Sequence, residues 1–109
     1  MSTAAQRYIK HAGETVNLAV DLRGLLDTGE TCTGTPTIVE VTTSALTISA
    51  KVVNTAALTI NGQTVAIGEA VTCRVAGGTA GVQYVIRVTV TTSASQVRIV
   101  LLRLAVVAD

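Results

Sequence analysis

The chain has very few of the side chains that carry out most protein chemistry. Its 109 residues include no tryptophan, no phenylalanine and one histidine, and charged residues make up only 14%. A Ser-His-Asp arrangement needs a histidine base held in a fixed geometry, and the single His11 lies close to the start of the chain. We therefore expect no enzymatic activity, no catalytic residue and no cofactor.

Basic residues are scattered as well as scarce. The eight Lys and Arg residues form no run, and the net charge is +1. Nucleic-acid binding usually needs clustered basic residues and aromatic rings for base stacking, and Tyr8 and Tyr84 are the only aromatics. No apolar stretch is long enough to cross a bilayer, and the first dozen residues lack the apolar core of a secretion signal. We expect no nucleic-acid or membrane partner, and a protein made in the cytoplasm.

The two cysteines fit that compartment. Cys32 and Cys73 each occupy an alternating position in a stretch rich in Thr and Val, which favours two small buried hydrophobic side chains. A zinc site needs four ligands, and these cysteines with His11 supply too few, so we expect no metal. A disulfide requires Cα atoms within about 7 Å, and the sequence leaves that pairing open.

Residues that favour β-strands are what the chain has in abundance. Val, Thr and Ile together number 42 residues, and β-branched side chains suit pleated sheets. Apolar and polar residues alternate over residues 16–22 and 82–91, and Asn61-Gly62 is the preferred pair for a tight hairpin. We also expect strands at residues 31–33, 37–42 and 97–107. About seven short strands with turns every 8 to 12 residues predict two packed sheets.

A glycine-rich corner before Tyr84 narrows the fold class. Gly77, Gly78 and Gly81 precede Tyr84, as in the tyrosine corner of immunoglobulin-like domains, where the hydroxyl bonds back to the preceding backbone. This loop lacks the spacing of a phosphate-binding loop, and we interpret it as the crossing between two sheets. We predict an all-β, immunoglobulin-like two-sheet β-sandwich over residues 14–109, with a short N-terminal arm over residues 1–13.

The last predicted strand, residues 97–107, is apolar on both faces. The outer face of a two-layer sandwich is normally polar. Either another part of the same chain covers this second face, or a protein partner does, and we favour the partner. Arg87 and Arg103 interrupt these strands, and the sequence leaves open whether they pair with Glu40 or Glu69 or form contacts across an interface.

Three elements are candidates for contacts with a partner. The arm is either a frayed terminus or a segment that reaches a neighbouring subunit, the loop over residues 25–30 combines apolar and acidic groups, and the last strand offers its outer face. The candidate residues are Arg7, Tyr8 and Lys10 in the arm, Leu25, Leu26, Asp27 and Glu30 in the loop, and Ile99, Leu101 and Arg103 on the strand.

Three stretches resemble a known family. They are AGETVNLAVDLRGLLDTGE, LTINGQTVAIGEAVTCRVAGGTAGVQY and VTVTTSASQVRIVLLRLAVV, and they are similar to the phage fiber-tail adaptor family of small immunoglobulin-like virion proteins. The chain departs from the family where Leu22, Leu25 and Leu26 stand in place of frequent aromatic residues. The resemblance implies a structural protein of the virion tail or neck, assembled in the host cytoplasm.

The resemblance also implies the partners. These are other virion proteins, namely tail, fiber or connector subunits, and further copies of the chain in a homo-oligomer or ring. A capsid decoration protein is the alternative within the virion. A carbohydrate-binding module is the alternative outside it, although sugar-binding faces usually present Trp or Tyr platforms, and this chain has no Trp.

Overall fold

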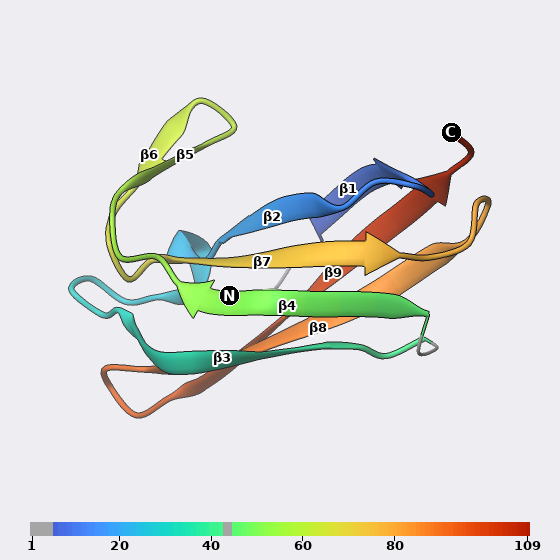
Figure 1. The fold of residues 1–109 in the computed structure, drawn as a ribbon. Helices are drawn as coiled ribbons and strands as arrows, with labels where there is room; N and C mark the ends of the chain where they lie inside the picture. The colour runs from blue at the N-terminus through green and yellow to red at the C-terminus, as the bar shows by residue number, and fades with distance from the viewer. Residues whose placement is uncertain (1–5, 43–44) are drawn as a thin grey trace.

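The computed structural model describes residues 6–42 and 45–109, and over these residues the chain forms nine β-strands and one short 3₁₀ turn, η1 (Figure 1). Within the same residues there is no helix with the length and apolar character to span a bilayer. The elements are β1 (Gln6–His11), β2 (Val16–Asp21), η1 (Arg23–Leu25), β3 (Cys32–Glu40), β4 (Leu46–Val53), β5 (Leu58–Ile60), β6 (Gln63–Val65), β7 (Ala70–Gly77), β8 (Gln83–Thr92) and β9 (Val97–Val107).

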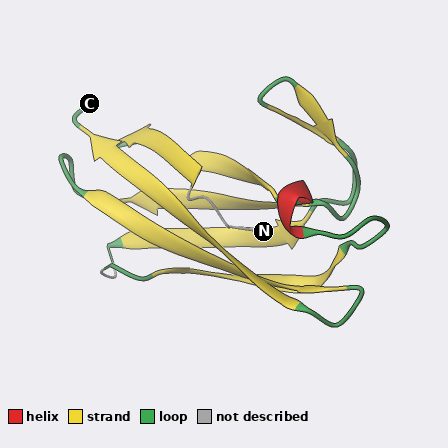
Figure 2. Cartoon of the chain, turned by 180° about the vertical axis from the view of Figure 1, so that it is seen from behind, coloured by secondary structure: helices red, strands yellow, loops and turns green. Residues whose placement is uncertain are grey.

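Two sheets form the two layers of the molecule. The four-stranded sheet has the order β1-β9-β8-β3, and the three-stranded sheet has the order β2-β7-β4. Figure 1 looks from the side of the three-stranded sheet and Figure 2 from the opposite side. The all-β prediction is confirmed, and the two layers are consistent with a β-sandwich.

The core between the sheets follows the alternation of the sequence. In β8 and β9, every second side chain is buried, as the pattern predicts for strands with one face on the core. The two free cysteines are also buried, as expected of small hydrophobic residues. The core comprises Leu18, Val20, Leu22, Cys32, Ile38, Val71, Cys73, Val75, Tyr84, Ile86, Val88, Val90, Val100, Leu102, Leu104 and Val106.

The segment predicted as an N-terminal arm belongs to the sheet from Gln6 onward. Strand β1 pairs in parallel with β9, and the Tyr8 hydroxyl donates a hydrogen bond to the Ala19 carbonyl of β2 at 2.8 Å. The Lys10 side chain is completely buried. These contacts make the segment an edge strand rather than a free arm, so the sandwich begins before residue 14. Residues 1–5 of the predicted arm lie outside the described residues.

The free edges at β3 and β4 are both irregular. In β3, Pro36 lies where the register with β8 shifts, and this strand is predicted from sequence as two shorter pieces. In β4, Ala50 has a φ of 53° where the register with β7 shifts. Proline cannot donate to a sheet ladder, and a bulge twists an edge. Both edges are therefore poor templates for an added strand.

The glycine-rich corner carries the chain from the three-stranded to the four-stranded sheet, as predicted. Gly77 has a φ of 84°, and a Cβ there would lie 2.7 Å from the Ala45 carbonyl oxygen. The Thr79 N–H donates a hydrogen bond to the Tyr84 hydroxyl oxygen at 2.7 Å. The predicted contact between the Tyr84 hydroxyl and the preceding backbone is therefore present, with the hydroxyl oxygen as the acceptor.

Strands β5 and β6 form a hairpin that projects from the body of the molecule, as both views show (Figures 1 and 2). Its turn is Asn61-Gly62, with φ values of 51° and 78°. Two positive φ values are the mark of a type I′ turn, so the predicted hairpin is confirmed.

Candidate functional site

The outer face of the four-stranded sheet carries a row of exposed apolar side chains. Along β9, Val97 is 63% exposed, Ile99 48% and Leu101 43%, and on β1 Ile9 is 74% exposed. The described residues of the chain place no layer over this face. The alternative that the chain itself covers the second face of its last strand is therefore wrong for residues 6–42 and 45–109.

Two arginines lie among these apolar residues. In the ladder of β8 and β9, Arg87 is opposite Leu101, and Val85 is opposite Arg103. Both arginines are exposed, and they are diagonal neighbours on one face. The backbone register also pairs Arg7 with Arg103, although the Arg7 side chain lies outside the described residues.

A hollow of about 360 Å³ lies at the β1 end of this face. It is lined by Tyr8, Ile9, Gln83, Arg103 and Ala105. Of the residues predicted to contact a partner, Ile99, Leu101 and Arg103 all lie on this outer face, as the alternation along β9 requires. The structure thus brings the strand candidates together with Ile9, which sequence reasoning did not include, and with Arg87, for which it left an interface contact open.

The outward positions of the four strands carry no carboxylate among the described residues. The ion pairs recorded between described residues are His11 with Glu14 and Asp21 with Arg23. Neither Arg87 nor Arg103 pairs with Glu40 or Glu69, so the internal pairing left open by the sequence is not formed. The face is therefore apolar and positively charged.

Lys10 is unavailable to a partner, although the sequence predicts that it reaches one. Its Nζ donates hydrogen bonds to the carbonyl oxygens of His11 at 2.8 Å and Ala12 at 3.2 Å. Tyr8 is half-buried, and burial is the main cause that raises its pKa to about 12. The Tyr8 hydroxyl ties β1 to β2, whereas the Lys10 ammonium binds carbonyls at the end of its own segment.

Glu30 is also turned inward rather than toward a partner. It is buried, and it accepts hydrogen bonds from the Asp27 N–H at 2.9 Å and from the Thr92 hydroxyl. These two bonds hold the pKa of Glu30 below its usual range, and the bond from Thr92 has the larger effect. In the same loop Asp27 is exposed, while Leu25 and Leu26 pack partly against the core.

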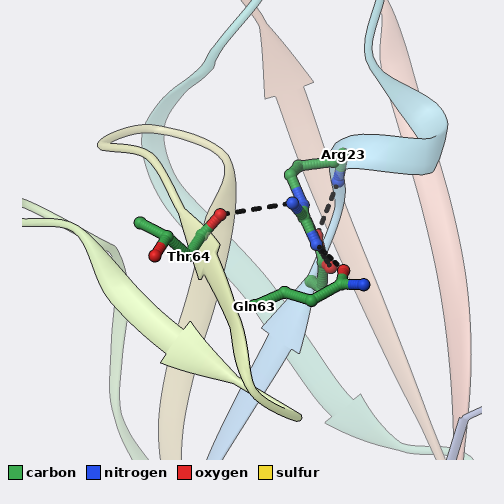
Figure 3. Close-up of polar contacts among 4 residues, drawn as sticks. Arg23, Gln63 and Thr64 are labelled. Carbon is green, nitrogen blue, oxygen red and sulfur yellow. Dashed lines mark hydrogen bonds and ion pairs between the residues drawn. The ribbon is translucent and has the colours of Figure 1, made fainter.

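An arginine ties the projecting hairpin to the body (Figure 3). The Arg23 guanidinium binds the Asp21 carboxylate, with Nη2 to Oδ2 at 2.7 Å, and donates to the Thr64 carbonyl at 3.2 Å and the Gln63 side-chain oxygen at 2.7 Å. Its hydrogen bonds lower the pKa of Asp21. The sequence offers only the close spacing of Asp21 and Arg23 as a hint of this contact.

The base of the hairpin is held by one buried amide. Asn54 Nδ2 donates to the Ala56 and Ala66 carbonyls at 2.9 Å each, and Oδ1 accepts from the N–H groups of Gly68 at 2.9 Å and Ala70 at 3.1 Å. A groove of about 500 Å³, whose lining includes Lys51, Val52 and Ile67, lies beside it. Sequence reasoning missed this site, because one asparagine between strands is an ordinary loop residue.

The buried thiols and the carboxylates do not assemble into a reactive cluster in the described part of the chain. No group of three or more His, Cys, Asp and Glu side chains there is placed to hold a metal ion. Burial raises the pKa of both Cys32 and Cys73, which keeps the thiols protonated and weakly nucleophilic.

Comparison with known proteins identifies a family whose model matches most of the chain. A family model described as "Podophage GP4 fiber-tail adaptor protein gp77" matches residues 10–104. No curated protein matches the chain. The match extends from β1 to the second half of β9, so it includes both sheets and the hairpin.

Proposed function

Because the chain belongs to the podophage GP4 fiber-tail adaptor protein gp77 family, we propose that it is a non-enzymatic structural protein of a phage virion. In this role it joins tail fibers, or other tail and neck components, to the particle. The family match supports the coarser part of this proposal, a tail adaptor, and the chemistry of the outer face supports the finer part.

The uncovered apolar face is the observation that carries the contact site. An exposed row of Val, Ile and Leu on a small monomer marks a surface that a partner covers. Ile99, Leu101 and Arg103 are our proposed contacts, joined by Ile9 and Arg87 on the same face. Asp27, which is exposed in the loop after η1, remains a second proposed contact.

Several copies per particle are part of the proposal. A specific interface usually buries about 800 Å² on each partner, and an adaptor has to bind at least two components. We propose that copies of the chain form a ring or smaller homo-oligomer through surfaces other than the apolar face.

We also propose that the sandwich is of the immunoglobulin-like class. In support, the orders β9-β8-β3 and β2-β7-β4 correspond to the G-F-C and B-E-D orders of that class. The contact between the Tyr84 hydroxyl and the Thr79 backbone supports the same assignment.

A phage that lacks this gene tests the adaptor role. We expect particles with filled heads but without fibers, and recovery of fibers when the intact gene is supplied from a plasmid. Gold labelling of the protein should mark the tail vertex. Normal fibers in the mutant would contradict the proposal, and label over the whole shell would instead favour the capsid decoration alternative.

A carbohydrate-binding module has less support from the side chains. Sugar-binding sites commonly use an exposed aromatic ring as a platform. Here Tyr84 is 2% exposed in the core, and the half-buried Tyr8 is bonded to β2 through its hydroxyl. Binding of the purified domain on a glycan array would reopen this alternative.

A further inference from the structure

We propose that the partner covering the outer face of the four-stranded sheet is a protein surface in which Asp or Glu residues flank an apolar patch. The inference rests on the proposed function, since it names the chemistry of the component that the adaptor binds. In this contact, the apolar patch covers Ile99 and Leu101, and the carboxylates bind Arg87 and Arg103.

The positions of the two arginines are the first argument. Arg87 is directly opposite Leu101, and Arg103 follows Leu101 two residues along β9 on the same face. Diagonal neighbours in an antiparallel sheet lie about 7–8 Å apart. Arginine side chains at that distance are able to reach one carboxylate or two adjacent ones, and a guanidinium binds a carboxylate through two parallel hydrogen bonds.

The cost of burying charge is the second argument. A partner that covers Leu101 must also remove water from Arg87, because the two side chains are neighbours across the ladder. A guanidinium that loses water without a carboxylate is strongly unfavourable. Neither arginine has an ion-pair partner among the described residues, so the covering molecule has to supply the negative charge.

The same face disfavours other occupants. A second copy that packs with the same face would bring arginines toward arginines, which is repulsive. Nucleic acid would supply phosphates, but phosphate binding needs clustered basic residues and single-stranded bases need aromatic platforms. The exposed row here is Val, Ile and Leu. An added strand would pair with an edge of this sheet, at β1 or β3, and would leave the exposed Val, Ile and Leu side chains on the face of β9 uncovered. The remaining occupant is a folded protein surface lying over the sheet.

Photo-cross-linking in assembled particles tests the occupant directly. Leu101 is replaced by p-benzoylphenylalanine in the phage, the purified particles are irradiated, and the linked peptide is identified by mass spectrometry. We expect a peptide of a different virion protein with Asp or Glu close to the linked residue. A link to a second copy of the chain, to DNA, or to a peptide without nearby acidic residues would overturn the inference. The same replacement at Ser49, exposed on the other sheet, is the matched control.

Charge reversal of both arginines is a test that is independent of the cross-linking. We expect R87E/R103E to lower the number of copies retained in particles at least about ten-fold, since breaking a buried charge pair weakens an interface strongly. Arg74 is exposed on the outer face of the three-stranded sheet, and R74E should leave retention unchanged. The variant R87Q/R103Q removes charge without adding repulsion and should lie between. Retention equal to the wild type in both double variants would refute the role of the arginines.

The two proposals fail in different ways. If the wild-type protein is absent from purified particles, the adaptor function itself is wrong. If the protein is present, but charge reversal is tolerated or the linked surface is not acidic, only the inference about the partner is wrong. Thermal unfolding of each purified variant, with an expected Tm close to that of the wild type, excludes misfolding as the cause.

Discussion

The two outer faces of the sandwich obey the same alternation but have different chemistry. On the three-stranded sheet the exposed side chains are small or polar, including Asn17, Thr47, Ser49 and Arg74, with Val52 exposed near the end of β4. On the four-stranded sheet they are Val97, Ile99 and Leu101 with Arg87 and Arg103.

The arginines show most clearly what this difference means. Arg74 Nε donates a hydrogen bond to the Asn17 side-chain oxygen at 3.2 Å within its own face. Arg87 and Arg103 have no ion pair with a described residue and lie beside apolar side chains. Exposed arginine is therefore common to both faces, and only one face combines it with an apolar row. The three-stranded sheet thus serves as an internal control for the other.

Two neighbouring leucines on β9 provide the strongest test of whether the exposed row contributes to folding or to a partner contact. Leu102 is fully buried and Leu101 is 43% exposed. We expect Leu102→Ala to lower the free energy of unfolding by about 2–5 kcal/mol, and Leu101→Ala to change it by less than about 1 kcal/mol. Urea unfolding followed by circular dichroism measures both. Comparable losses would mean that Leu101 contributes to folding and not to a partner contact.

Two asparagines test the polar side of the comparison. Asn54 bonds four backbone groups at the end of β4, while Asn17 is exposed on the face of β2. Asn54→Ala removes the side-chain oxygen that accepts from the Ala70 N–H, and it leaves the Gly68 N–H only its longer bond to the Asn54 backbone carbonyl at 3.2 Å. We expect a loss of about 1–3 kcal/mol. Asn17→Ala should stay within about 0.5 kcal/mol. Equal stability of the two variants by urea unfolding would argue against the amide clamp.

The buried carboxylate of Glu30 predicts that the stability of the folded protein depends on pH. Hydrogen bonds lower the pKa of Glu30 in the folded protein, so its ionised form stabilises the fold above its ordinary pKa of about 4.3. That contribution is lost as the pH falls through the lower folded value. We expect the Tm difference between the wild type and Glu30→Gln to be largest near neutral pH and to shrink below about pH 4. A difference that stays constant with pH would contradict this account.

The smallest effect concerns the arginine that holds the hairpin. Its ion pair with Asp21 is partly exposed, and such pairs contribute little to global stability. Arg23→Ala should leave the Tm nearly unchanged but speed hydrogen exchange of the β5 and β6 amides. Arg74→Ala, which loses only the bond to Asn17, is the matched control and should leave that exchange unchanged. Unaltered hairpin exchange in Arg23→Ala would show that Asn54 suffices to hold it.

The positions of the strands and the apolar nature of both faces of β9 were predictable from the sequence. Both follow from which residues occupy alternate positions along one short stretch. The sequence likewise predicted the Asn61-Gly62 turn and the Tyr84 contact, since both depend on residues a few positions apart. Lys10 and Glu30 were predicted as partner contacts and are buried. Their burial depends on long-range packing, as the pairing of β1 with β9 and the bond from Thr92 to Glu30 show. The partners of Arg23 and the four bonds of Asn54 were missed for the same reason.

By itself, then, the sequence determined that the chain is all-β, which residues alternate between core and surface, and to which family the chain is similar. Only the tertiary structure decided that β1 pairs with β9, that no described segment covers the outer face of the four-stranded sheet, and that Arg87 and Arg103 lie on that face without a carboxylate. The physical reason is that alternation is local, whereas the covering of a face and the pairing of a charge depend on which distant strands become neighbours.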